Sequence, residues 1–321
     1  MVYKKKITVL SLIIAALAIA YLFGWVFDPQ RMGSRSAAFT WLDPKLTGQI
    51  SKITINSSGE IKDLVRKNNE WFVSYNGTDY PARRFRVEDF ISVLTKRAPY
   101  PVQSSNAASH TRLGIADEAA SRITVSGGSG LPLLDLLLGQ ADITGQNIYL
   151  RRQGQNEVRS GEDTFTAYVN SARNSWYNLR LFPESETGKL DSGSVQRLSV
   201  YVPADGGTAA EPRVFTRSGT AWTFSGISVA SPDMGKVDAY VSVILNTEGD
   251  DFGYSVNPND PMFGDSRISL EFGDGSIKTI RLAPPGESGH CYAQVTGSSH
   301  VYSIPSWAVS RLFSEDFEKD Q

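Results

Sequence analysis

The chain has 321 residues, of which 40% are hydrophobic, 11% aromatic and 21% charged. This composition excludes a disordered chain and leaves room for two ordinary domains. The 32 basic and 34 acidic residues give a formal charge of -2, so no bulk positive field recruits nucleic acid. Cys291 is the one cysteine, which excludes an intrachain disulfide and any zinc site that needs two thiolates.

The N-terminus has the pattern of a membrane anchor. Lys4, Lys5 and Lys6 precede Ile7 to Phe27, an uncharged run of 21 residues, and about 20 suffice for a helix to cross the lipid bilayer. A cleaved signal peptide is the alternative, because Ala18-Ile19-Ala20 resembles a cleavage site. The apolar run continues past that site and favours an uncut transmembrane helix at residues 7–27. The lysines predict that residues 1–6 stay in the cytoplasm and that the rest lies outside.

After a Pro-, Gly- and Ser-containing juxtamembrane linker at residues 28–47, the chain is predicted to contain two tandem repeats, 48–182 and 193–315. Gly48–Ile55 matches Gly193–Val200, and Trp71 matches Trp222. Val87–Leu94 and Val237–Ile244 carry the same apolar stripe at i, i+3, i+4 and i+7, which predicts two one-sided helices. Residues 183–192 are predicted to form a short polar linker between the repeats.

The second half of each repeat carries further matches. Arg122–Val125 corresponds to Arg267–Leu270, Ile148–Leu150 to Cys291–Ala293, and Phe165 to Trp307. Each repeat is therefore predicted to form three strands, a helix, two hairpins and a short closing helix. The expected fold class is α+β, an N-terminal transmembrane helix followed by two mainly antiparallel sheet modules with covering helices.

These landmarks resemble a family of bacterial exported proteins that carry the domain of unknown function 4340. The shared features are a leading I-x-I strand, a strand with a tryptophan, the Tyr80-Pro81-Ala82 step into the striped helix, and a later strand with Tyr149 or Tyr292. The second repeat departs from the pattern, with Ser231-Pro232-Asp233-Met234 at the step. The resemblance implies a periplasmic accessory subunit, anchored in the bacterial inner membrane, of a gliding-motility-type ABC transporter. It implies no catalytic residue.

The residue pair His290-Cys291 is the most tempting catalytic pattern, because an imidazole can activate a thiol. Adjacent side chains of a strand point to opposite faces, so this pair cannot hydrogen-bond directly. Cys291 also aligns with Ile148, and a free cysteine behaves as a small buried hydrophobe. The interpretation is a core position rather than a nucleophile.

Other chemical motifs are absent from the sequence or incomplete. Asp250, Asp251, Asn257, Asn259, Asp260 and Asp265 offer oxygen ligands, but their spacing is not that of an EF-hand loop and an ordinary polar loop is expected. The chain lacks a G-x-x-x-x-G-K-[ST] phosphate loop and a G-x-S-x-G nucleophile elbow. The sequence therefore predicts no catalytic residue, no cofactor and no metal.

Two loops that follow the striped helices, residues 100–112 and 246–264, are predicted to bind a partner, because they are long and differ between the repeats. Their candidate residues are Tyr100, Asn106, His110 and Arg112 in the first loop and Asp250, Asp251, Asn259 and Asp260 in the second. The leading hypothesis is a non-enzymatic subunit that binds the permease, a second accessory subunit or the exported substrate. A glycan-binding module and an envelope hydrolase without a familiar motif are the alternatives.

Overall fold

The computed structural model describes residues 38–186, 188–201, 212–226, 233–264, 266–283 and 290–313, together with Ile14 and Leu17. The chain divides into two compact units: unit 1 contains residues 1–79 and 84–172, and unit 2 contains residues 80–83 and 173–321. These limits differ from the predicted repeats in two places. Residues 80–83 and 173–182, predicted to lie in the first repeat, belong to unit 2.

Most of the predicted membrane anchor lies outside the described residues. This applies to the cytoplasmic residues 1–6, to residues 7–27 apart from Ile14 and Leu17, and to residues 28–37 of the linker. None of the helices in the described ranges is both long and apolar enough to span a bilayer. The described part of the linker includes β1 (Ala38–Phe39), which pairs with β6 (Ala98–Pro99).

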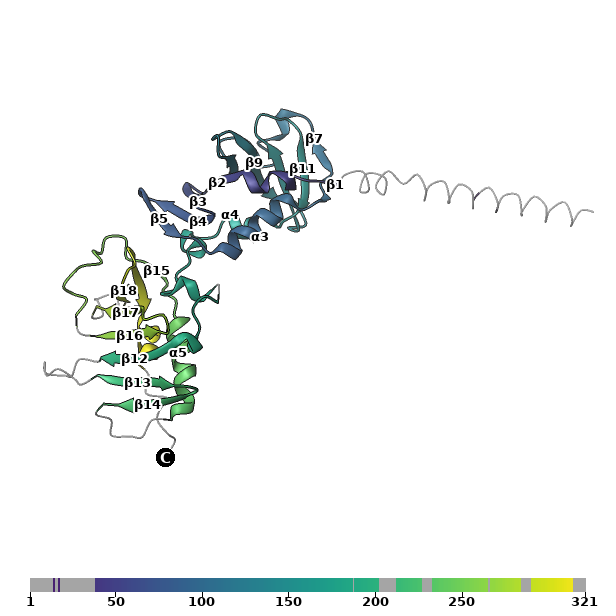
Figure 1. Cartoon of the computed structure of the whole chain (residues 1–321). Helices are drawn as coiled ribbons and strands as arrows, with labels where there is room; N and C mark the ends of the chain where they lie inside the picture. Colours follow the sequence, from purple (N-terminus) through teal and green to yellow (C-terminus); the bar gives the residue numbers. More distant parts are fainter. Residues whose placement is uncertain are drawn as a thin grey trace, which may run out of the picture. The chain divides into compact units, whose positions relative to one another are not determined.

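Unit 1 is built on a mainly antiparallel sheet with the strand order β5-β4-β3-β2-β8-β9-β10-β11-β7 (Figure 1). The strands of this sheet are β2 (Ile50–Ser57), β3 (Glu60–Lys67), β4 (Glu70–Tyr75), β5 (Thr78–Pro81), β7 (Val102–Ser104), β8 (Ser121–Gly127), β9 (Pro132–Ala141), β10 (Asn147–Arg152) and β11 (Val158–Glu162); of β5, only Thr78 and Asp79 belong to unit 1. The helical elements are η1 (Pro44–Gln49), α3 (Arg84–Thr95), η2 (Ala107–Ser109) and α4 (Thr166–Val169).

Unit 2 has a second antiparallel sheet with the order β14-β13-β12-β16-β17-β18-β19-β15. Its strands are β12 (Val195–Tyr201), β13 (Arg213–Ser218), β14 (Ala221–Ser225), β15 (Asp251–Phe252), β16 (Arg267–Phe272), β17 (Ile277–Leu282), β18 (His290–Val295) and β19 (Val301–Pro305). The helical elements are η3 (Arg173–Trp176), η4 (Pro183–Ser185), η5 (Ser192–Ser194), η6 (Met234–Lys236), α5 (Val237–Leu245) and α6 (Ser306–Leu312). The two sheets confirm the predicted α+β class with mainly antiparallel strands.

Tight turns set the register of the first hairpins in unit 1. Ser58 and Gly59 have φ values of 53° and 81°, and Asn76 and Gly77 have φ values of 49° and 78°. Consecutive positive φ values define the type I′ turn, whose twist matches that of two antiparallel strands. The turn at Ser58-Gly59 pairs Ile53 with Leu64 across the hairpin, and both side chains are fully buried.

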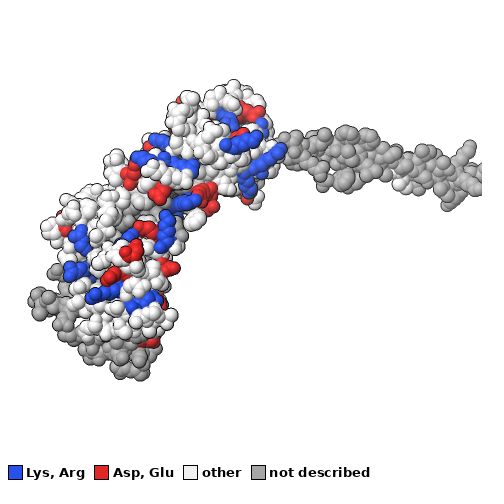
Figure 2. Space-filling view, in the orientation of Figure 1, with Lys and Arg blue, Asp and Glu red and all other residues white. Residues whose placement is uncertain are grey.

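The striped helices pack as the sequence predicts. Helix α3 buries Val87, Phe90 and Leu94, and α5 buries the corresponding face from Val237 to Ile244. Burial of one apolar face is the main source of stability for helices of this length. The outer surfaces of both units mix basic and acidic side chains on the face shown in Figure 2, which agrees with the small net charge of the chain.

Candidate functional site

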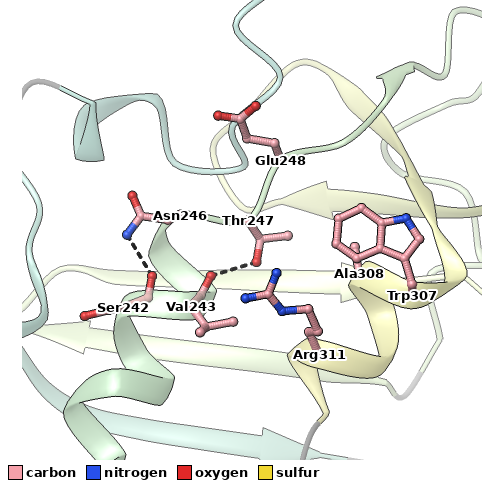
Figure 3. Close-up of a pocket in the computed structure, with 8 residues that line it drawn as sticks. All are labelled: Ser242, Val243, Asn246, Thr247, Glu248, Trp307, Ala308 and Arg311. Atoms are coloured by element: carbon pink, nitrogen blue, oxygen red, sulfur yellow. Dashed lines mark hydrogen bonds between the residues drawn. The ribbon is translucent and has the colours of Figure 1, made fainter.

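The candidate site is a pocket of about 470 Å³ in unit 2, between the end of α5 and α6 (Figure 3). Ser242, Val243, Asn246, Thr247 and Glu248 form one wall, and Trp307, Ala308 and Arg311 of α6 form the other. Helix α6 is held at this position by the Tyr240 hydroxyl of α5, which donates a hydrogen bond to the carbonyl oxygen of Leu312. The pocket therefore depends on the packing of the striped helix.

The wall formed by α5 and the segment after it uses its polar groups internally. Asn246 Nδ2 donates to the Ser242 carbonyl oxygen at 2.8 Å, and Thr247 Oγ1 donates to the Val243 carbonyl oxygen at 2.8 Å (Figure 3). Asn246 Oδ1 accepts a hydrogen bond from Arg180 Nη1 at 2.9 Å. These bonds fix the shape of the wall and contribute no charge to the pocket.

Glu248 is the acidic residue of the pocket, and two arginines neutralise it. Its carboxylate accepts from Arg83 Nη2 at 3.0 Å and from Arg180 Nε at 3.1 Å. All three side chains are partly exposed, so solvent screens these pairs and their contribution to stability is small. The carboxylate is nevertheless committed to the two guanidinium groups.

The wall formed by α6 is different in character. Trp307 is 62% exposed, and Arg311 follows it at i+4, which places both side chains on one face of the helix. Figure 3 shows both projecting from α6 on the side that faces Thr247. Arg311 is exposed and makes no ion pair with any described residue. An exposed tryptophan beside an unpaired arginine is typical of interface hot spots.

The pocket has the chemistry of a binding site. Its indole can pack against an apolar or planar group, and its guanidinium can bind a carboxylate. The described lining residues include neither a histidine nor a cysteine, and Ser242 Oγ donates to the carbonyl oxygen of Asp238 in its own helix.

This site was not predicted from the sequence. Trp307 aligns with Phe165 at the end of each repeat, but Phe165 is fully buried whereas Trp307 projects into solvent. The local signal is a tryptophan four residues before an arginine and two residues after Pro305. That pattern becomes informative only when the exposed face of α6 is known.

The first predicted loop, residues 100–112, lies in unit 1 and is only partly a surface loop. Tyr100 is buried, and its ring lies 5.3 Å from that of Trp41. A Cβ on Gly161 would lie 2.3 Å from the Tyr100 ring, so the ring occupies the space that the glycine leaves. Burial raises the pKa of Tyr100. This residue supports the core and does not offer a surface to a partner.

The other candidates of this loop are closer to solvent. Asn106 is exposed, and its side chain caps η2 by accepting from the Ala108 N–H at 3.0 Å. His110 Nε2 lies 3.1 Å from the Asn156 carbonyl oxygen. Arg112 is exposed, and its carbonyl oxygen accepts from Gln140 Nε2 at 2.6 Å. Asn106 therefore shapes the loop itself, whereas His110 and Arg112 connect it to Asn156 and Gln140.

The second predicted loop, residues 246–264, lies in unit 2. Asp251 accepts hydrogen bonds from the Tyr254 hydroxyl at 2.5 Å and from the Phe252 N–H at 2.8 Å. Asn259 and Asp260 belong to a separate turn, in which Asp260 Oδ1 accepts from the Met262 N–H at 2.9 Å. The loop also supplies Asn246, Thr247 and Glu248 to the pocket, three residues of the predicted range that are not among its candidate residues.

The structure confirms the core interpretation of Cys291. Its side chain is buried while that of the adjacent His290 is exposed. Burial raises the pKa of the Cys291 thiol, so the reactive thiolate is disfavoured near neutral pH.

His290 has two partners that the sequence analysis missed. Its Nδ1 lies 3.1 Å from Asp250 Oδ2 and 3.4 Å from Ser303 Oγ. These three residue types form the triads of serine hydrolases, but a triad needs the carboxylate on one ring nitrogen and the serine on the other. Both partners contact the same nitrogen here, so this geometry does not relay a proton from Ser303. Among the described residues, no three His, Cys, Asp or Glu side chains gather as metal ligands.

Comparison with known proteins gives two matches. A family model described as "Domain of unknown function (DUF4340)" matches residues 71–261. A protein of Treponema pallidum (strain Nichols), described as an uncharacterized protein, is 21% identical over 259 residues, which cover 81% of this chain and 71% of the relative.

Proposed function

This chain belongs to the family of the domain of unknown function DUF4340, and on that premise we propose that it is a non-enzymatic binding subunit. Its α5–α6 pocket captures a protein partner. Trp307 carries this proposal, because a 62% exposed indole beside an arginine that has no ion-pair partner among the described residues has a role in recognition and none in the core.

Similar construction of the two units supports a duplicated scaffold. Apart from β5, the strand order of unit 1 corresponds element by element to that of unit 2. The ladder between β2 and β8 shifts register between Ile50 and Lys52, and the ladder between β12 and β16 shifts between Val195 and Arg197. Ile50 and Lys52 align with Val195 and Arg197 in the sequence, so the two irregularities lie at equivalent positions. A β-bulge at an equivalent position is not expected in two unrelated sheets.

Residue pairs across the strands support the same proposal. Ile55 lies opposite Ile123 in unit 1, and Val200 lies opposite Ile268 in unit 2. Trp71 pairs with Arg66, and Trp222 pairs with Arg217. If the repeats arose by duplication, positions that still correspond serve the fold, and positions that diverged are free to serve a function. Trp307 is a diverged position, because it is exposed whereas its counterpart Phe165 is buried.

The proposed location is the bacterial inner membrane, with both units on the periplasmic side. Its support is the uncharged run at residues 7–27 behind Lys4, Lys5 and Lys6. The proposed partners are the permease and accessory subunits of an ABC transporter of the gliding-motility type, a proposal that rests on the family resemblance.

The test is capture of partners by the full chain from solubilised bacterial membranes. The double variant W307A/R311Q removes the indole and the charge, and I277A removes a 59% exposed side chain from β17 of the same unit as a control. We expect wild type and I277A to retain the same transporter components and W307A/R311Q to lose them. Equal capture by all three proteins would contradict the pocket, and capture without any transporter component would contradict the proposed partners.

A further inference from the structure

Unit 2 contains a second depression, of about 620 Å³, most of whose lining residues are polar. Pro258 and Asn259 border it from the loop before β16, Arg281 from β17 and Gln294 from β18. The turn between β18 and β19, Thr296 to Ser299, closes the remaining side. The volume is that of a site for a small molecule.

Arg281 is the charged group of this depression, and its hydrogen-bond partners are neutral. Its Nε and Nη2 donate to Gln294 Oε1 at 3.0 and 2.7 Å, and its Nη2 also donates to the Pro258 carbonyl oxygen at 3.0 Å. Among the described residues, no carboxylate forms an ion pair with Arg281. The acidic side chain nearest in the loop sequence, Asp260, accepts from the N–H of Met262 within its own turn.

Gln294 fixes the direction of the guanidinium. Its side chain is only 4% exposed, and its Nε2 donates to the carbonyl oxygens of Val295 at 2.6 Å and Ser298 at 3.2 Å. With the amide nitrogen held by the turn, the amide oxygen faces Arg281. A buried amide therefore positions the arginine at the edge of the depression.

The corresponding place in unit 1 shows what Arg281 lacks. Arg281 lies opposite Gln294 in the ladder between β17 and β18, and Leu137 lies opposite Arg151 in the ladder between β9 and β10. In unit 1 the arginine of this residue pair, Arg151, is therefore on β10, whereas in unit 2 Arg281 is on β17, the counterpart of β9. Arg151 is 3% exposed, donates to the carbonyl oxygens of Ile115 and Gln155, and forms an ion pair with Asp117.

The two units therefore differ in how they stabilise this arginine. A guanidinium in a partly buried place needs acceptors for its N–H groups and a counter-charge. In unit 1, Asp117 supplies the negative charge opposite Arg151. In unit 2, the carbonyl oxygen of Pro258 and the amide oxygen of Gln294 accept hydrogen bonds from Arg281 but carry no negative charge. These hydrogen bonds use Nε and Nη2 of Arg281. Its Nη1 is left to donate a hydrogen bond to a bound anion.

We propose that the Arg281 depression is a binding site for an oxyanion, a carboxylate or a phosphate, on a small polar ligand of monosaccharide size. The guanidinium supplies the charge and a donor geometry that fits both groups. The exposed side chains of Asn259 and Ser299 supply donors and acceptors for ligand hydroxyls. This site is separate from the α5–α6 pocket and does not depend on the function proposed for it.

Isothermal titration of the full chain in detergent at low salt tests the proposal with inorganic phosphate, glucuronate and the neutral sugar glucose. The variant R281L installs the leucine that unit 1 has at Leu137, and R281Q keeps polarity without charge. R197Q is the control, because Arg197 is an exposed arginine on β12 of the same unit. We expect saturable binding of phosphate or glucuronate that R281L and R281Q weaken at least tenfold, with R197Q unchanged and glucose much weaker.

The two anions distinguish the ligand class. Tighter binding of phosphate indicates a phosphorylated ligand, and tighter binding of glucuronate indicates an acidic sugar. Protection of the Thr296–Ser299 amides from hydrogen exchange on binding is a second readout that locates the ligand. Absence of binding by wild type, equal binding of glucose, or unchanged binding by a folded R281Q protein would each overturn the proposal.

Discussion

Phe85 and Phe90 lie on the same helix, α3, in opposite environments. Phe90 is fully buried and its ring lies 5.0 Å from that of Tyr168, whereas Phe85 is 58% exposed. Phe90→Ala is expected to lower the free energy of unfolding of unit 1 by about 3–5 kcal/mol, because it removes a buried ring and leaves a cavity. Phe85→Ala is expected to change it by less than about 0.5 kcal/mol. Hydrogen exchange of the unit 1 amides in increasing urea measures both.

This pair of variants is its own control, since both remove the same side chain from the same helix. A similar loss of stability from the two substitutions would mean that α3 does not face the sheet through its predicted stripe. Unchanged protection of the unit 1 amides in Phe90→Ala would have the same meaning.

Buried cations are the residues that the sequence could not predict. Lys62 is 1% exposed and donates to the Val169 carbonyl oxygen at 2.8 Å, a partner more than a hundred positions away in the sequence. Arg151 is equally enclosed by carbonyl oxygens from other segments. Lysine and arginine are almost never fully buried unless paired, so a single sequence gives no reason to place either side chain inside the fold.

At the scale of elements, the strands and helices with a regular pattern were predictable. The alternation in Ile53 and Ile55 and the stripe from Val87 to Leu94 follow from burial of one face, and the structure buries those faces. The affiliation of residues 80–83 with unit 2 was not predictable. Tyr80 packs against Phe252 at 4.7 Å and Tyr177 at 5.5 Å, contacts that have no local signal in the sequence.

Only one wall of the candidate site could be predicted from the sequence. The loop at 246–264 includes Asn246, Thr247 and Glu248, so one wall of the pocket was inside a predicted range. The other wall depends on the direction in which α6 presents Trp307 and Arg311. That direction is set by Ala308 and Leu312, which are 3% and 0% exposed, and therefore by tertiary packing.

Strand β19 carries a tyrosine that makes unit 2 sensitive to alkaline pH. Tyr302 is 1% exposed, and burial raises its pKa to about 12, against about 10 in an unfolded chain. Above pH 10 the unfolded state releases a proton that the native state retains, so stability falls as the pH rises towards 12. We expect this residue to cost about 1 kcal/mol of stability at pH 11 relative to pH 9.

Tyr302→Phe provides the measurement, because phenylalanine has no proton to release. Urea unfolding of unit 2, followed by hydrogen exchange at a fixed time, is compared at pH 9 and pH 11. The variant should lose less stability than wild type over this range, although Tyr177, whose pKa burial also raises to about 12, contributes in both proteins. An equal loss in the two proteins would show that Tyr302 ionises in the native state as readily as in the unfolded one.

At the scale of the whole molecule, the small net charge favours recognition through individual side chains. The net charge of -2 and the mixed surface in Figure 2 give no long-range field that would steer a partner. Arg281 and Arg311 are both arginines of unit 2 without an ion-pair partner among the described residues, and each borders a pocket. Binding at either site should therefore depend on one guanidinium and weaken with added salt only modestly.

The proposed membrane anchor determines which compartment both units occupy. Residues 7–27 are uncharged and follow Lys4, Lys5 and Lys6, a pattern for which the positive-inside rule predicts a cytoplasmic N-terminus. An alkaline phosphatase domain fused after Gln321, active only outside the cytoplasm, is expected to be active in bacteria, and a cytoplasmic reporter at the same position is expected to be silent.

N-terminal sequencing of the mature protein then separates an anchor from a signal peptide, since both give an active phosphatase fusion. Because the apolar run continues past Ala18-Ile19-Ala20 to Phe27, we expect the mature chain to retain Met1 to Tyr21 and to stay with the membrane after extraction at high pH. Substituting Lys4, Lys5 and Lys6 by glutamine is expected to weaken the orientation and reduce phosphatase activity. A mature chain that begins at Tyr21 and is released from the membrane would contradict anchoring. It would leave the two pockets as sites of a freely diffusing periplasmic protein.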